Sequence, residues 1–222
     1  MLKTYGIVSG LAPKGAVTMK SALLSVAANK GLQVEVVMDD RIPPVDASDA
    51  RTALVDRKIT VMDAVSALAE DGVVAVLVAG LQAQTFLPEV QTETQVPVVS
   101  LWNVVAEYAQ KKGVTKIGVL GGVDAAEKKG LVDAYAGFEL VFPSDDIGCC
   151  SNAEDRTTHV VRVAEDLKAQ GAELLLPWCE HAVEALAVLE EKGFPVCNPY
   201  VLVGEYVLER EWKRLAKPFK VG

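Results

Sequence analysis

The sequence predicts an α/β protein with two similar Rossmann-like lobes, each a four-stranded parallel sheet with helices on both faces and the active-site cleft between the lobes. Short segments rich in Val, Leu and Ile recur without polar alternation, which is typical of strands buried on both faces of a parallel sheet. Longer segments with apolar residues at helical spacing lie between them. Regular alternation of strands and helices favours this fold class with right-handed crossovers.

Eight segments are predicted as strands. Most of them follow a glycine that comes just after a polar helix end, where glycine can take the left-handed conformation that closes the last turn. Those glycines are Gly31, Gly72, Gly113, Gly171 and Gly193. The predicted strands are residues 5–9, 34–38, 73–78, 96–101, 116–120, 139–142, 174–176 and 196–198.

Helices are predicted over residues 17–29, 59–70, 153–170, 181–192 and 200–215. Ser151 and Asn152 are the expected N-cap pair of the third of these helices. We expect residues 1–101 with the C-terminal helix 199–222 to form the first lobe and residues 102–198 the second. The last helix is expected to pack back on the first lobe, because two chain crossings make a stiffer hinge than one.

Composition excludes several classes of function. The chain has 222 residues and a net charge of −8, so it repels phosphate backbones and nucleic acid is not an expected partner. No segment approaches the ~20 apolar residues of a membrane span, and the N-terminus does not look like a signal peptide. We therefore expect a cytoplasmic protein with reduced cysteines and no membrane partner. Neither histidine has a zinc-type ligand set, and dinucleotide, P-loop and nucleophile-elbow motifs are missing from the sequence.

Small and polar residues follow the predicted strands, at the edge of a parallel sheet where ligands bind. Glycine there lets a ligand approach the backbone, which suggests a cradle for an anion; ordinary tight turns also use glycine. The candidate ligand-binding residues at these positions are Ser9, Gly10, Gly80, Gln82, Gly121 and Gly122.

Cys179 is the candidate residue whose side chain is most reactive. It lies at a predicted strand-to-helix turn, where a helix N-terminus stabilises a thiolate, and Glu180 and His181 follow it. A thiolate there can take a proton from a carbon acid or attack an electrophile. Cysteine is also common as a small buried apolar residue, and His181 can equally be a first-turn residue that faces solvent. The pair Cys149 and Cys150 is expected in a loop, and Cys197 in the core.

These residues resemble motifs of the aspartate/glutamate racemase superfamily, which includes hydantoin racemases, maleate isomerases and arylmalonate decarboxylases. The resemblance covers nearly the whole chain. It rests on Val8-Ser9-Gly10 with Pro13, Asp49-Ala50-Arg51-Thr52, residues 86–91 with 96–98, and residues 175–181. It implies two pseudo-symmetric lobes, each with a catalytic cysteine on one face of the substrate α-carbon. It also implies a small carboxylate substrate, no pyridoxal phosphate or metal cofactor, and a possible homodimer.

The chain departs from the family pattern at the first cysteine. Where the family reads A-C-N-T-A, this chain has Ala79-Gly80-Leu81-Gln82-Ala83, so Gly80 takes the place of that cysteine. Aligned to C-T-H, Cys179 is the second catalytic cysteine and His181 the following histidine. Aligned to C-T-E through Glu180, Trp178 takes the cysteine position; we prefer the first alignment because it keeps a thiol at the turn.

The resemblance leaves three interpretations open. The chain is a racemase-like isomerase that acts on aspartate, glutamate or a related carboxylate by proton transfer at one thiol. It is a one-cysteine decarboxylase or isomerase, for which protonation from one face is enough. Or it binds a small carboxylate without turnover. Arg51, a candidate substrate-binding residue, favours aspartate because Arg51-Thr52 resembles part of the I-P-D-R-T segment of aspartate racemases, although a surface ion pair is the commoner role for such a residue.

Overall fold

The structure, a computed structural model, describes residues 2–42, 50–123, 125–144 and 155–209, except the side chains at 50, 51 and 125–127. The described residues form two compact units. Unit 1 contains the chain up to Val104 and resumes at Tyr200, and unit 2 spans Val105–Pro199. Each unit has a parallel β-sheet flanked by helices, which confirms the predicted α/β fold class.

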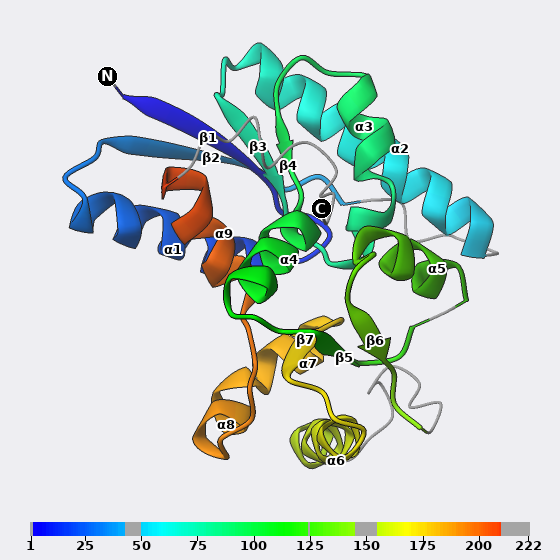
Figure 1. Cartoon of the computed structure of the whole chain (residues 1–222). Coiled ribbons are helices and arrows are strands. Elements are labelled where there is room, and N and C mark those ends of the chain that lie inside the picture. The colour runs from blue at the N-terminus through cyan, green and yellow to red at the C-terminus, as the bar shows by residue number, and fades with distance from the viewer. Residues whose placement is uncertain (1, 43–49, 124, 145–154, 210–222) are drawn as a thin grey trace. The chain divides into compact units, whose positions relative to one another are not determined.

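The sheet of unit 1 has four parallel strands in the order β2-β1-β3-β4 (Figure 1). The strands are β1 (Lys3–Val8), β2 (Val34–Asp39), β3 (Ala75–Val78) and β4 (Val98–Val99). Because β1 and β3 are central and buried on both faces, their sequences are continuously apolar where they pair. Their carboxyl ends lie at the same edge of the sheet, since Val8 of β1 pairs with Val78 of β3.

Helices α2 (Ala50–Glu70) and α3 (Leu87–Thr92) form a core with one face of this sheet. Gly6 allows the close approach of α2, because a Cβ there would lie 2.9 Å from Leu68 Cδ1. The side chains on this face, including Val76 and Val78, make one buried cluster with Val61 and Val65 of α2. A short 3₁₀ helix, η1 (Gln82–Thr85), connects β3 to α3.

Helix α9 (Pro199–Glu209) packs against α1 (Pro13–Asn29) at unusually short range. A Cβ on Gly15 would lie 2.4 Å from Cζ of Tyr200, and a Cβ on Gly204 would lie 2.7 Å from Cβ of Ala22. Both contacts require glycine for space, because interaxial distances are set by the side chains at the contact. After unit 2, the chain therefore returns to the first helix of unit 1.

The sheet of unit 2 has three parallel strands in the order β6-β5-β7. The strands are β5 (Lys116–Leu120), β6 (Glu139–Val141) and β7 (Leu174–Pro177). The helices assigned from Leu101 to Glu191 are α4 (Leu101–Lys111), α5 (Ala125–Ala134), α6 (Arg156–Ala169), α7 (Glu180–Glu184) and α8 (Leu186–Glu191). Residues of α6, α7 and α8 share one buried cluster with Leu120 and Leu175 of the sheet.

The prediction that residues 196–198 form a fourth strand of this sheet is wrong. Only a single bridge joins Val196 to Leu175. Leu175 donates its N–H to the carbonyl of Pro195 (2.7 Å), and its own carbonyl accepts from the N–H of Cys197 (3.2 Å). Proline supplies no backbone donor, and Pro199 starts the next helix, so the segment is too short for a full ladder.

Several predicted helix boundaries shift, and the predicted helix 181–192 is divided into α7 and α8, which meet at Ala185. Helix α1 starts at Pro13 and α2 at Ala50, so each is longer at its N-terminal end than predicted. Helix α6 starts at Arg156, and its N-cap is Asp155, whose carboxylate accepts a hydrogen bond from the N–H of Thr158 (3.0 Å). The predicted caps Ser151 and Asn152, and also Cys149 and Cys150, lie outside the described residues.

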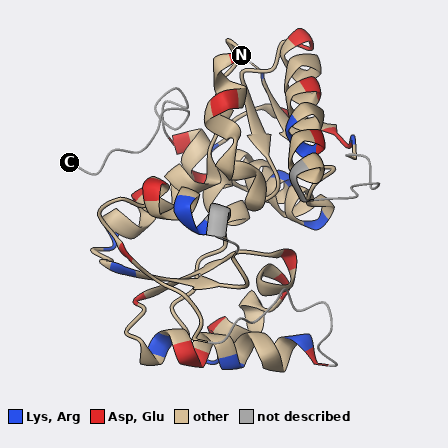
Figure 2. Cartoon of the chain, turned by 90° about the vertical axis from the view of Figure 1, so that its right-hand side faces the viewer, with Lys and Arg blue, Asp and Glu red and all other residues tan. Residues whose placement is uncertain are grey.

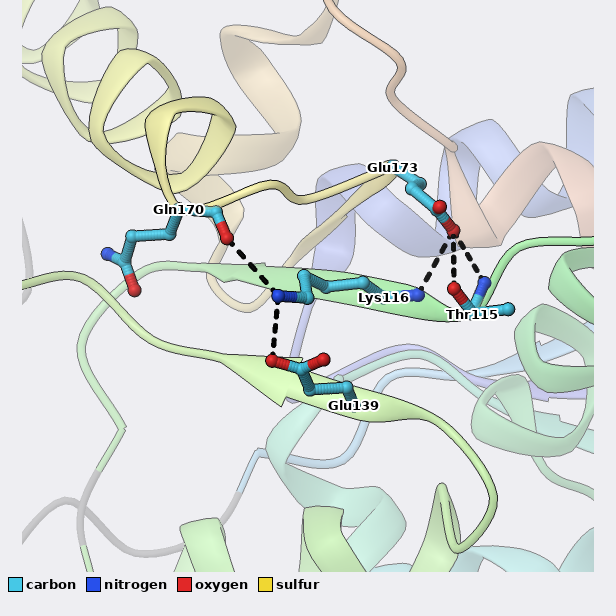
Figure 3. Close-up of polar contacts among 5 residues, drawn as sticks. All are labelled: Thr115, Lys116, Glu139, Gln170 and Glu173. Carbon is cyan, nitrogen blue, oxygen red and sulfur yellow. Dashed lines mark hydrogen bonds and ion pairs between the residues drawn. The ribbon is translucent and has the colours of Figure 1, made fainter.

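At the amino-terminal edge of the second sheet, polar contacts join its strands (Figure 3). The Glu173 carboxylate accepts hydrogen bonds from both the N–H and the hydroxyl of Thr115 (2.6 and 3.1 Å) and from the N–H of Lys116 (3.2 Å). These bonds, the Thr115 N–H first, lower the pKa of Glu173. The Nζ of Lys116 contacts Glu139 at 2.7 Å, which links β5 to β6.

Charges of both signs are interspersed on the helices, and Figure 2 shows blue and red segments along α6. Among the described residues, none of the helices is apolar over the length that a membrane crossing requires.

Candidate functional site

Cys179 lies in the turn between β7 and α7, two residues after the strand ends. Trp178 donates its N–H to the carbonyl of Leu120 at 3.0 Å, so the start of this turn is bonded to the end of β5. Cys179 has an extended backbone at the N-cap of α7, and its carbonyl accepts from the N–H of Val183 at 3.1 Å. Its reduced thiol is half-buried and packs against the apolar core of unit 2. The thiol is therefore held by packing without being sealed from solvent.

Gly121 lies directly beside this thiol. Its φ of +144° is rarely adopted by residues with side chains. A Cβ at Gly121 would lie 3.2 Å from Cβ of Trp178 and 3.7 Å from Sγ of Cys179. A side chain at position 121 would therefore contact both Trp178 and the sulfur; Gly122, the following residue, is half-buried. The structure thus brings together two predicted site residues, Gly121 and Cys179, at the ends of neighbouring strands.

His181 is the second residue of α7 and is half-buried. Its ring Nε2 lies 2.8 Å from Nη1 of Arg156, the first residue of α6. Arg156 is not among the residues predicted from the sequence, since the two partners are 25 positions apart and the motif around each is ordinary. Glu180 is the first residue of α7 and is also half-buried.

In unit 1, the corresponding strand ends are tightly closed by main-chain contacts. The carbonyl of Asp39 accepts from both the N–H (2.8 Å) and the hydroxyl (2.9 Å) of Ser9, so this buried hydroxyl links β1 to β2. A Cβ on Gly10 would lie only 1.8 Å from the carbonyl oxygen of Arg41. Glycine is required at position 10 because another stretch of backbone crosses it.

Gly80 follows β3 with a φ of +138°, and a Cβ there would lie 3.2 Å from Cβ of Leu11. The predicted ligand-binding residue Gln82 lies two residues further on, in η1, and is exposed. The absence of a side chain at Gly80 is thus combined with a backbone conformation that other residues rarely adopt.

The structure also assigns a role to Gln84, which is not among the residues predicted from the sequence. Its side chain is buried, and its Nε2 donates to the carbonyls of Val78 (3.3 Å) and Gly80 (3.2 Å). Its Oε1 accepts from the N–H of Leu101 at 2.9 Å. Gln84 therefore holds the turn after β3 to the start of α4. A long amide in a turn of small residues was the available signal.

The turns after β3 and β7 have equivalent hydrogen bonds. The N–H of Ala79 bonds to the carbonyl of Val8 at 2.9 Å in unit 1, as Trp178 bonds to Leu120 in unit 2. Ala79 therefore corresponds to Trp178, and the next residues, Gly80 and Cys179, occupy equivalent positions in the two units.

Other candidates have different surroundings. Arg51 falls in the first turn of α2, but its side chain lies outside the described residues. Cys197 is buried, its thiol faces the carbonyl of Leu175 at 3.7 Å, and burial raises its pKa to about 12. Cys197 is therefore a core thiol. Within the described part of the chain, His, Cys, Asp and Glu side chains form no group of three or more that would hold a metal ion.

Comparison with known proteins gives one family match. The model of the family described as Asp/Glu/hydantoin racemase matches residues 8–179, which include every strand of both sheets except β1, of which only the last residue is covered. No curated protein sequence matches the chain.

Many solved structures share the fold. An aspartate racemase homologue from Pyrococcus horikoshii OT3 is 20% identical with a TM-score of 0.70, covering 93% of this chain and 98% of its own. Allantoin racemase from Klebsiella pneumoniae is 17% identical with a TM-score of 0.67, covering 94% of this chain and 87% of its own. An arylmalonate decarboxylase is 16% identical with a TM-score of 0.56, covering 96% and 92%. At these identities the likeness shows the fold and leaves the substrate open.

Proposed function

The chain belongs to the Asp/Glu/hydantoin racemase family, and from that premise we propose that it transfers a proton at the α-carbon of a small carboxylate through the thiol of Cys179. The observation that carries the proposal is the position of Cys179: it is a reduced, half-buried cysteine at the strand-end turn, next to Gly121, which has no side chain. Its equivalence to Gly80 supports the alignment in which Cys179, and not Trp178, is the family's second cysteine.

The chemical step needs one base and no cofactor. The Cys179 thiolate takes the proton from the α-carbon, and an S–H bond forms as the C–H bond breaks. The electron pair left on carbon is delocalised into the carboxylate, and backbone N–H groups of the strand-end turns are suited to stabilise that charge. Return of the proton from sulfur to carbon restores the thiolate. The proposed carboxylate-binding residues are Arg51, Gly80, Gln82, Gly121 and Gly122, with Glu180 and His181 beside the thiol. Ser9 and Gly10 are no longer proposed as binders, because both donors of Ser9 are bonded to the Asp39 carbonyl and the backbone of Arg41 crosses Gly10.

Gly80 determines the stereochemical expectation. Because it has no side chain, the position equivalent to Cys179 supplies no second thiol. A single base that removes and returns the proton from one face exchanges hydrogen with solvent while keeping the configuration. We therefore propose exchange with retention as the main reaction of an amino-acid substrate, with slow racemisation at most.

The test is incubation of aspartate, glutamate and hydantoins in D₂O, with loss of the α-proton followed by NMR and configuration by chiral chromatography. Exchange that disappears in Cys179→Ala supports the proposal. The matched control is Cys197→Ala, which removes the buried core thiol and is expected to keep the exchange. Absence of exchange for every compound in the wild type refutes it.

A one-cysteine decarboxylase is the second candidate, and Gly80 is the observation that favours it. After loss of CO₂ the carbanion needs a proton from one face only, so the missing second thiol is no disadvantage. Release of CO₂ from substituted malonates, lost in Cys179→Ala, would identify this activity. A third outcome, carboxylate binding without turnover, predicts thermal stabilisation alone, worth about 2.7 kcal/mol at 100 times Kd.

A further inference from the structure

The contact between Arg156 and His181 determines which ring nitrogen of His181 carries the hydrogen. Arginine has only N–H donors and keeps its charge, so its Nη1 can approach a ring nitrogen only as a donor. The 2.8 Å contact therefore makes Nε2 of His181 the acceptor. A neutral imidazole with an acceptor at Nε2 carries its hydrogen on Nδ1.

The backbone of each partner is fixed in the first turn of a helix. Arg156 is the first residue of α6, directly after the N-cap Asp155, whose carboxylate is bonded to the N–H and the hydroxyl of Thr158. The Thr158 hydroxyl and then its N–H lower the pKa of Asp155, so the cap stays ionised at neutral pH. His181 lies in the first turn of α7, two residues after Cys179, and its carbonyl accepts from the N–H of Ala185 at 3.2 Å.

We propose that Arg156 is a positioning residue that holds His181 in the Nδ1–H form, so that His181 serves as a hydrogen-bond donor at the thiol-bearing turn and not as a base through Nε2. This inference deepens the proposed function and rests on it for its catalytic meaning. The pair also adds a permanent positive charge to the turn, which favours anions there, whether a thiolate or a substrate carboxylate.

The decisive measurement needs no substrate. The chain has only two histidines, so ¹⁵N spectra of the ring nitrogens contain two sets of signals, and His159→Gln assigns them. In the wild type we expect His181 in the Nδ1–H form with Nε2 as acceptor. In Arg156→Ala that single form should give way to a mixture, and Arg156→Lys, which keeps a cationic donor, should restore it in part. Arg162→Ala, on the same helix, is the control and should leave the His181 signals unchanged.

Two results overturn the inference: a wild-type His181 that carries its hydrogen on Nε2, or unchanged His181 signals in Arg156→Ala. Activity gives an independent readout. With an exchange substrate, kcat should fall at least about tenfold in Arg156→Ala, with partial rescue in Arg156→Lys. Because the spectra are recorded without substrate, they decide the role of Arg156 even when the wild type turns over nothing, which would refute the proposed function alone.

Discussion

The backbone of Gly121 passes so close to Cys179 that a methyl group there would lie 3.7 Å from the sulfur. The contact joins the ends of β5 and β7, and a φ of +144° at Gly121 makes it possible. Access to the thiol therefore depends on a neighbouring strand as well as on its own turn.

Gly121→Ala should reduce both stability and activity. The positive φ and the 3.2 Å approach to Trp178 Cβ together should cost about 1–3 kcal/mol of unfolding free energy. Exchange at the α-carbon should also slow, since the methyl group fills space beside the thiol. Gly193→Ala is the matched control: its φ is +73° with nothing within 4 Å, so it should lose about 1–2 kcal/mol and keep the exchange rate. Equal exchange rates in the two variants would contradict the role given to Gly121.

Gly80→Cys should not create a two-thiol racemase. The φ of +138° is unfavourable for cysteine, and the new Cβ would press on Leu11, so about 1–3 kcal/mol of stability should be lost. Urea unfolding measures the loss, and chiral chromatography measures racemisation. A variant of wild-type stability that racemises aspartate or glutamate would show that the turn readily accepts a side chain.

Gln84→Ala should reduce stability, whereas Gln82→Ala should leave it nearly unchanged. Removing the buried Gln84 amide takes the acceptor from the N–H of Leu101 and one donor from each of two carbonyls, which should cost about 1–3 kcal/mol. Gln82 is exposed, so its truncation should change stability by less than about 0.5 kcal/mol. If Gln82 binds substrate, its variant should instead raise KM for exchange. Urea unfolding and initial rates separate the two cases.

Cys197 should make stability fall at alkaline pH. Burial raises its folded-state pKa to about 12, whereas an unfolded cysteine ionises near about 8.5. The folded state then binds more protons in that interval, so the contribution is complete below about pH 8.5 and is lost as pH rises toward 12. The stability difference between wild type and Cys197→Ala should shrink by up to about 1.4 kcal/mol per pH unit. A difference that stays constant from about pH 8 to about pH 10.5 would contradict the assignment.

Local chemistry explains which parts of the fold were predictable. All five glycines that follow predicted helix ends have positive φ, as expected: Gly31, Gly72, Gly113, Gly171 and Gly193. The buried strands were also predictable, because burial on both faces demands continuous apolar sequence. Residues 196–198 begin with two apolar residues, but a longer ladder would also need backbone N–H donors at Pro195 and Pro177, which proline lacks.

The site was predictable only where a residue type carries the signal. Cys179 and the strand-end glycines stand out in the sequence, and the structure places Gly121 against Cys179. Arg156 and Gln84 do not stand out, because their importance comes from partners that folding supplies. Arg156 meets a histidine 25 positions away, and Gln84 bonds to a backbone N–H 17 positions away.

The packing of α9 on α1 has a consequence for biosynthesis. Tyr200 and Gly204, which fit against Gly15 and Ala22, are translated more than 180 residues after them (200 − 15 = 185 and 204 − 22 = 182). The face of α1 that α9 covers therefore stays uncovered while the whole of unit 2 is translated. Nascent chains halted before Tyr200 should need chaperone protection, and a truncated chain that ends at Val104 should aggregate unless α9 is supplied as a separate peptide.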